Sequence, residues 1–152
     1  MFEKILVCLD GSKLAEQILP YAVEQALRLD SKVVLLRVVV DPVVVAAGAV
    51  IPVPASAIPE ETQEEESEAR AYLDSVAKPL RQKGVDIELV TLYGTAGEAI
   101  VRYARDKGMG LIAMATHGRS GLGRAVFGSV ADFVLRESGL PILVIKPKES
   151  VT

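Results

Sequence analysis

The sequence predicts an α/β fold built on a single doubly wound parallel sheet with helices on both faces. Short apolar runs rich in β-branched residues alternate with longer segments whose apolar residues recur every three or four positions. Strict alternation of this kind gives five strands separated by four helices, and right-handed crossovers then require a parallel sheet. The first run, residues 5–9, is apolar throughout, as expected for a central strand that is covered on both faces.

Composition predicts one cytoplasmic domain. The chain has 152 residues, half of them apolar, which is enough to bury a core in one domain, here residues 1–152. The net charge of -3 gives no electrostatic footprint for nucleic acid. Cys8 is the only cysteine, so an internal disulfide is excluded, a reducing cytoplasm is expected, and the thiol is interpreted as buried and inert.

Neither a membrane span nor a targeting segment is predicted. Residues 33–58 are strongly apolar, but Arg37, Asp41 and several prolines interrupt them. The apolar run at residues 5–9 is too short for a signal sequence.

The first predicted helix follows Asp10-Gly11-Ser12, with Ser12 as its N-cap. Its apolar stripe consists of Leu14, Ile18, Ala22, Val23, Ala26 and Leu29. Pro20 lies within this pattern and predicts a kink or a broken hydrogen bond. The β-branched run at residues 32–40 predicts the second strand.

Residues 41–59 are interpreted as a loop. They are rich in valine and alanine, yet they contain four prolines and Gly48, which are expected to prevent a regular element from persisting. A lid, a partner surface and a partly disordered loop all remain open for this segment.

A long helix is predicted from Glu60 to Gly84, with Pro79 disturbing its last turn. The acidic run at residues 60–68 is interpreted as a solvated face rather than a metal site. Residues 85–92 alternate between polar and apolar side chains, which predicts a half-buried strand at the edge of the sheet.

Two further helices are predicted to begin at capping patterns. Thr95 and Glu98 have the spacing of a capping box, and the helix that they open ends at Gly108. Ser129 and Asp132 have the same kind of spacing at the start of the last helix. A final short strand is predicted at Ile142–Ile145.

The stretch from Leu111 to Ser129 has the pattern of an anion-binding site. The apolar strand Leu111–Ala115 leads into a loop that contains Gly118, Gly121 and Gly123 and precedes the last helix. Glycines let backbone N–H groups approach a phosphate, and a helix N-terminus adds a positive dipole end. Arg119 and Arg124 add positive charge. Neither a Walker A motif nor a dinucleotide-binding fingerprint occurs in the chain.

These residues resemble the universal stress proteins, and specifically their ATP-binding branch. The family pattern G-x2-G-x9-G-[ST] is matched by Gly118, nine intervening residues and Gly128-Ser129, while Ala115 replaces its first glycine. The similarity extends from the opening K-I-L-V-C-L-D-G-S to the closing P-I-L-V-I-K-P. It implies a Rossmann-like fold of the adenine nucleotide alpha hydrolase type with strand order 3-2-1-4-5. Asp10 and the Gly118 loop would then converge on one cleft at the switch point.

The resemblance implies a site for an adenine nucleotide, ATP with Mg²⁺ that the phosphates and water hold. Its site residues would be Cys8, Leu9, Asp10, Val38, Met114, Ala115, His117, Gly118, Arg119, Ser120, Gly121, Gly128, Ser129 and Val130. No catalytic residue and no dedicated metal ligand is identified, and His117 is interpreted as a structural loop residue.

Two residues have alternative interpretations. Asp10 either accepts a hydrogen bond from the base or ribose, as the resemblance implies, or forms an ordinary turn and cap with Ser12. Ser129 donates to a phosphate, caps the last helix, or does both.

The sequence is compatible with two functions. The first is an ATP-binding, nucleotide-responsive regulatory module in stress response, with slow ATP hydrolysis left open. The second is a scaffold that dimerises and binds partner proteins without nucleotide. In either case the resemblance implies a homodimer that pairs through Ile142 to Ile145, an apolar edge strand.

Overall fold

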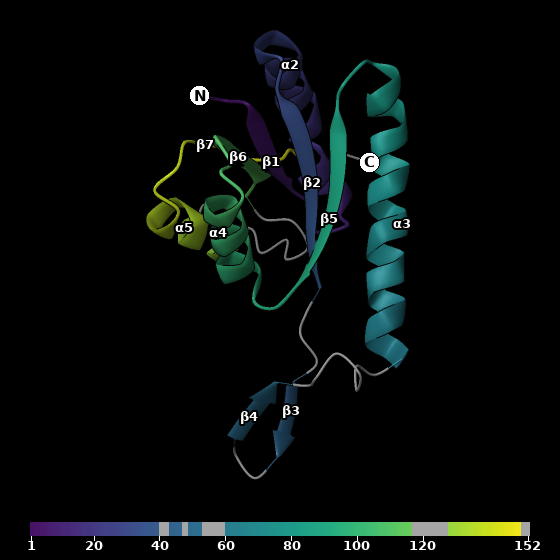
Figure 1. The fold of residues 1–152 in the computed structure, drawn as a ribbon, viewed down its shortest axis with the longest axis vertical. Helices are drawn as coiled ribbons and strands as arrows, with labels where there is room; N and C mark the ends of the chain where they lie inside the picture. The colour runs from purple at the N-terminus through teal and green to yellow at the C-terminus, as the bar shows by residue number, and fades with distance from the viewer. Residues whose placement is uncertain (40–42, 47–48, 53–59, 117–127, 150–152) are drawn as a thin grey trace.

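Five parallel strands form the central sheet (Figure 1). The computed structural model describes residues 1–39, 43–46, 49–52, 60–116 and 128–149, with the backbone alone for 43–46 and 49–52. The strands are β1 (Lys4–Cys8), β2 (Lys32–Val39), β5 (Ile87–Tyr93), β6 (Leu111–Ala115) and β7 (Ile142–Ile145). Their order β5-β2-β1-β6-β7 confirms the predicted order 3-2-1-4-5 and places β5 and β7 at the two edges.

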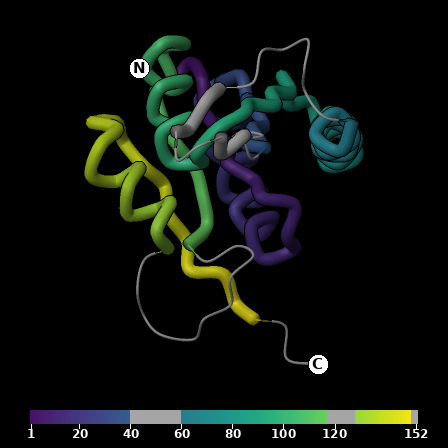
Figure 2. Tube along the Cα trace, turned by 90° about the horizontal axis from the view of Figure 1, so that it is seen from below, coloured from purple at the N-terminus to yellow at the C-terminus, as the bar shows by residue number. Residues whose placement is uncertain are grey.

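Helices cover both faces of the sheet. Because successive strand residues point to opposite faces, Ile5 and Val7 join one buried cluster while Leu6 and Cys8 join the other. The first cluster lies under α1 (Lys13–Glu16), α2 (Leu19–Leu29) and α3 (Glu60–Gln82), and the second under α4 (Ala96–Asp106) and α5 (Ser129–Glu137). Figure 2 shows α3 end-on at one side of the molecule and α5 at the opposite side.

The first helical segment consists of two helices instead of the single kinked helix predicted. Helix α1 ends at Glu16, and α2 begins at Leu19, which puts Pro20 in the first turn of α2. A proline is tolerated in that turn because its missing N–H would have no partner within the helix. Leu29, predicted to face inward, is 45% exposed because α2 ends there and the chain turns through Asp30 in a left-handed conformation.

The prediction of an irregular segment at residues 41–59 is wrong in part. Strands β3 (Val43–Ala46) and β4 (Ala49–Pro52) pair in antiparallel fashion as a hairpin that is separate from the main sheet. Figure 1 shows the hairpin away from the five-stranded sheet. The β-branched residues favour strands, and Pro52 stands at a strand end, where proline is tolerated.

Helix α3 continues through Pro79 to Gln82, so the proline does not break it. The helix ends two residues before the predicted Gly84, which follows in a turn with φ of +88°. Thr95 is the N-cap residue of α4, but its side chain makes no capping hydrogen bond, so the predicted capping box does not form. The Ala99 N–H instead donates to the Thr95 carbonyl at 2.9 Å, the ordinary bond of a first helical turn.

None of the helices in the described part of the chain combines the length and the apolar character that crossing a membrane requires.

Candidate functional site

A cavity of about 500 Å³ lies at the carboxyl ends of the central strands. Strands β1 and β6 are neighbours in the sheet but far apart in the chain, and the helices that follow them pack on opposite faces. This is the switch point of a doubly wound sheet, where ligands of open α/β folds bind. The cavity is lined by Cys8, Leu9, Asp10, Ala15, Leu36, Arg37, Val38, Val39, Glu65, Glu68, Ala96, Ile100, Met114, Ala115, Gly128, Ser129, Val130 and Ala131.

The turn after β1 is held by its own side chains. Asp10 Oδ1 accepts hydrogen bonds from the Ser12 backbone N–H at 2.9 Å and from the Ser12 hydroxyl at 2.6 Å. The Ser12 Oγ in turn accepts from the Ala15 N–H at 3.1 Å, which confirms Ser12 as the N-cap of α1. The turn chemistry expected for Asp10 is therefore present, while its contact with a base or ribose stays a prediction.

A guanidinium group packs against the same turn. Gly11 has φ of +89°, a backbone conformation that favours glycine, and a Cβ added there would lie 3.1 Å from Arg37 Cζ, so the guanidinium lies directly against the turn. The Arg37 Cζ lies 5.3 Å from the centroid of the Tyr72 ring, a cation–π arrangement between β2 and α3. Positive charge is thus placed beside the Asp10 turn.

The hydroxyl of Tyr72 extends this arrangement to α1. It donates to Glu16 Oε1 at 3.0 Å. Burial raises the pKa of Tyr72 most, and the hydrogen bond to Glu16 raises it further, so the hydroxyl remains a proton donor at neutral pH. Residues of β2, α3 and α1 are therefore linked on one side of the cavity.

The N-terminus of α5 forms the opposite side of the cavity, and within the described residues no side chain caps it. Gly128 is its N-cap residue, and Ser129 is the first helical residue instead of the cap that the sequence predicted. The predicted pairing of Ser129 with Asp132 does not form, and the Asp132 carboxylate lies 3.0 Å from Arg136. First-turn N–H groups without a side-chain acceptor, together with the positive dipole end, favour an anion here.

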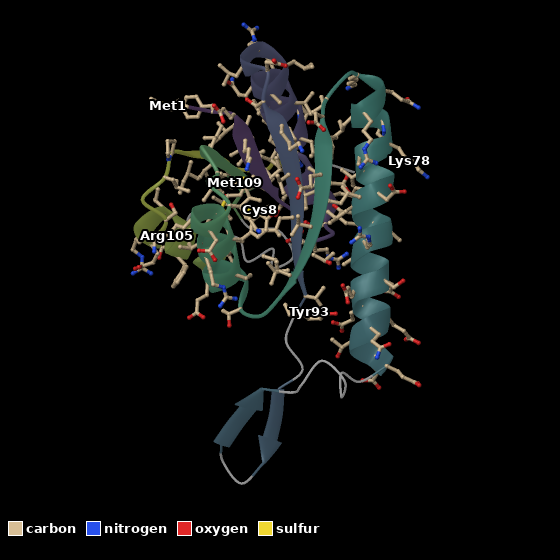
Figure 3. All side chains as sticks on the ribbon, in the orientation of Figure 1. Met1, Cys8, Lys78, Tyr93, Arg105 and Met109 are labelled. Atoms are coloured by element: carbon tan, nitrogen blue, oxygen red, sulfur yellow. The ribbon has the colours of Figure 1, made fainter. Side chains whose placement is uncertain are left out.

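Strand ends supply an apolar surface between these two walls. Cys8 on β1 and Met114 on β6 are buried, and Ala115 is half-buried. Figure 3 shows Cys8 in the interior of the molecule. Burial raises the pKa of the Cys8 thiol to about 12, which confirms the predicted inert, protonated thiol.

The structure brings the predicted site residues of the described chain to this one cavity. These are Cys8, Leu9, Asp10, Val38, Met114, Ala115, Gly128, Ser129 and Val130. The other predicted site residues, His117, Gly118, Arg119, Ser120 and Gly121, lie outside the described residues. The motifs did not point to the lining residues from α3 and α4, namely Glu65, Glu68, Ala96 and Ile100, nor to Arg37 on β2.

The acidic run of α3 carried one signal that could have identified two of these residues. Glu65 and Glu68 are three positions apart, which places them on one side of a helix. Within the described residues, no group of three or more histidine, cysteine, aspartate or glutamate side chains is arranged to hold a metal ion. Glu65 and Glu68 are exposed, in agreement with the predicted solvated face, and they also line the cavity.

Comparison with known proteins gives consistent results. Residues 1–146 match the universal stress protein family. Universal stress protein YxiE of Bacillus subtilis is 30% identical to this chain, and the match covers 96% of the chain and 100% of that relative. The solved structure of MJ0577 of Methanocaldococcus jannaschii is similar with a TM-score of 0.79 and 28% identity, over 99% of each chain.

Two more distant structures show the same fold. One is a universal stress protein solved in complex with cAMP, with a TM-score of 0.70, 19% identity, and coverage of 97% of this chain and 98% of the other. The second, an Arabidopsis thaliana protein of this family with AMP bound, has a TM-score of 0.67 and 18% identity over 96% of this chain and 92% of its own.

Proposed function

This chain belongs to the universal stress protein family. From that premise we propose that its cavity binds an adenine nucleotide, namely ATP with Mg²⁺. We also propose that the single domain acts as a nucleotide-responsive regulator in stress response. The observation that carries the proposal is the arrangement of the Asp10 turn and the uncapped start of α5 around one cavity at the switch point. The proteins of this fold that were solved with cAMP and AMP support it.

The charges of the cavity give the bound nucleotide an orientation. The first-turn N–H groups of α5 and the Ser129 hydroxyl receive the phosphates, while contacts from Gly118 and Arg119, which lie outside the described residues, stay predictions from the sequence motif. Asp10 and the backbone of Val38 receive the nucleoside, whose amine and hydroxyl groups donate to oxygen acceptors. Mg²⁺ then comes with the phosphates, because the described residues offer it no carboxylate cluster.

Calorimetric titration of nucleotide-stripped protein tests the proposal directly. ATP with Mg²⁺, ADP, AMP and cAMP are titrated in parallel, with GTP as the comparison. We expect saturable binding of the adenine nucleotides with dissociation constants in the micromolar range and weaker binding of GTP. Absence of binding by every nucleotide would contradict the proposal and favour a protein-binding scaffold that works without nucleotide.

We also propose that the protein is a homodimer that pairs through β7. This strand ends the sheet order, and its four residues, Ile142–Ile145, are all apolar and only half-buried. An apolar edge strand pairs readily with a second copy across a two-fold axis. Sedimentation equilibrium at micromolar concentration is expected to give the dimer mass, and a monomer mass there would contradict this pairing.

A further inference from the structure

We propose that Glu65 and Glu68 of α3 make the cavity selective for nucleotides whose ribose hydroxyls carry no phosphate. The inference rests on the proposed function, because it concerns the nucleoside end of the same cavity. Both residues line the cavity and lie on the same side of α3. The cavity is therefore bounded by two carboxylates from one helix and by the N-terminus of α5 from another.

Contacts with β5 hold this part of α3 in place. The carboxylate of Glu66 accepts a hydrogen bond from the Tyr93 hydroxyl and lies 3.5 Å from Thr91 Oγ1. Figure 3 shows Tyr93 near the end of β5, beside the N-terminal half of α3. Thr62 and Ala69 on the same helix are buried. Glu65 and Glu68 are thus carried to the cavity by a helix segment that is anchored to the sheet.

The charged residues of the described lining carry more negative than positive charge. In the described lining the charged residues are Asp10, Arg37, Glu65 and Glu68. Arg37 packs on the Tyr72 ring and against Gly11, beside Asp10. Across the described ranges, no lysine or arginine forms an ion pair with either lining glutamate. The described lining therefore favours an anion at the start of α5 and disfavours one beside Glu65 and Glu68, whose carboxylates outnumber the single guanidinium of Arg37.

A nucleotide with free ribose hydroxyls fits this distribution of charge. Hydroxyl groups donate hydrogen bonds to carboxylates, so a ribose beside α3 is compatible with Glu65 and Glu68. A phosphate on the 2′ or 3′ oxygen removes that donor and adds nearly two negative charges at the same place. Repulsion from two carboxylates then weakens binding of the ribose-phosphorylated nucleotide.

The experiment compares AMP with adenosine 2′,5′-bisphosphate and adenosine 3′,5′-bisphosphate by calorimetric titration. Wild-type protein is expected to bind AMP more tightly than either bisphosphate. The double substitution Glu65→Gln and Glu68→Gln keeps side-chain size but removes both charges, and it is expected to reduce that preference by about tenfold. Added salt is expected to reduce the wild-type preference as well, because screening weakens charge repulsion but leaves a steric barrier unchanged.

The matched control is the double substitution Glu61→Gln and Glu64→Gln. All four glutamates are exposed on α3, but Glu61 and Glu64 do not line the cavity, so the preference for AMP should stay at the wild-type value. Equal binding of AMP and the bisphosphates by wild-type protein, or an equal change in both double variants, would overturn the inference. AMP binding without discrimination leaves the proposed function standing, whereas absence of AMP binding overturns both.

Discussion

The helices that follow β1 and β6 both begin at the cavity, and their N-termini are completed in different ways. At α1, Ser12 caps the helix and Asp10 accepts both the backbone N–H and the hydroxyl of Ser12. At α5, the N-cap residue is Gly128, and no side chain of the described residues makes a capping hydrogen bond. Both helices follow strands that are neighbours in the sheet, so the difference lies in the local sequence rather than in the topology.

The glycines at these two termini, Gly11 and Gly128, also differ, because only Gly11 has a backbone conformation that favours glycine. Gly11 has φ of +89°, a conformation that other residues rarely adopt, so the turn itself requires glycine. Gly128 has φ of -52° and ψ of 149°, which any residue can adopt. Backbone conformation therefore does not explain a glycine at the start of α5, whereas the proposed function does, because a phosphate needs access to the N–H groups there. The turn before α1 is held by its own side chains, and under the proposed function the start of α5 is completed by the ligand.

The largest effect is expected from Gly128→Val, which tests this contrast at α5. A branched side chain should block approach to the first-turn N–H groups, while the backbone can accept it without strain. We expect ATP affinity to fall by about 100-fold or more, equivalent to about 2.7 kcal/mol, with little change in the melting temperature. Calorimetric titration and thermal unfolding of the same preparation measure both quantities.

Gly128→Ala serves as the graded comparison, since one methyl group obstructs less than three carbon atoms do. Its ATP affinity should lie between those of wild type and the valine variant. Wild-type affinity in the valine variant, with an unchanged melting temperature, would place the nucleotide elsewhere.

Most of the sheet was predictable from local sequence. The strands are apolar runs between helical patterns, and β1, β2 and β5 differ from prediction by no more than two residues at any end. The strand order is predicted only by the family resemblance, because the hydrophobic periodicity of a segment does not show which other strand it pairs with. The hairpin β3–β4 is not predicted because prolines near its ends indicate irregular structure, although Val43 to Val45 have strong β-propensity.

The cavity was predictable only where motifs mark it. Asp10 and Ser129 belong to sequence motifs, and the structure places both at the cavity. Glu65 and Arg37 reach it because α3 and β2 pack there, which no local pattern encodes. Capping is similarly ambiguous in sequence. Ser12 caps its helix, but Ser129 has a comparable pattern and lies one position inside α5.

A smaller effect is expected from a matched pair of serine substitutions, which separates a cap from a ligand contact. Ser12→Ala removes the N-cap bond to Ala15 and the hydroxyl bond to Asp10. It should cost about 1 kcal/mol of unfolding free energy and lower the melting temperature by about 2–4 °C. Ser129→Ala removes no capping bond, so stability should stay within about 0.5 kcal/mol of wild type.

Nucleotide affinity is expected to change mainly in Ser129→Ala. If the Ser129 hydroxyl donates to a phosphate, its removal should weaken ATP binding by about tenfold, the value of one hydrogen bond to a charged group. Ser12→Ala should change the affinity less, because its hydroxyl is already committed to Asp10 and Ala15. Equal losses of stability in the two variants would mean that Ser129 caps α5 in solution. The contrast between the two helix N-termini would then disappear, and with it the reason for placing the phosphates at α5.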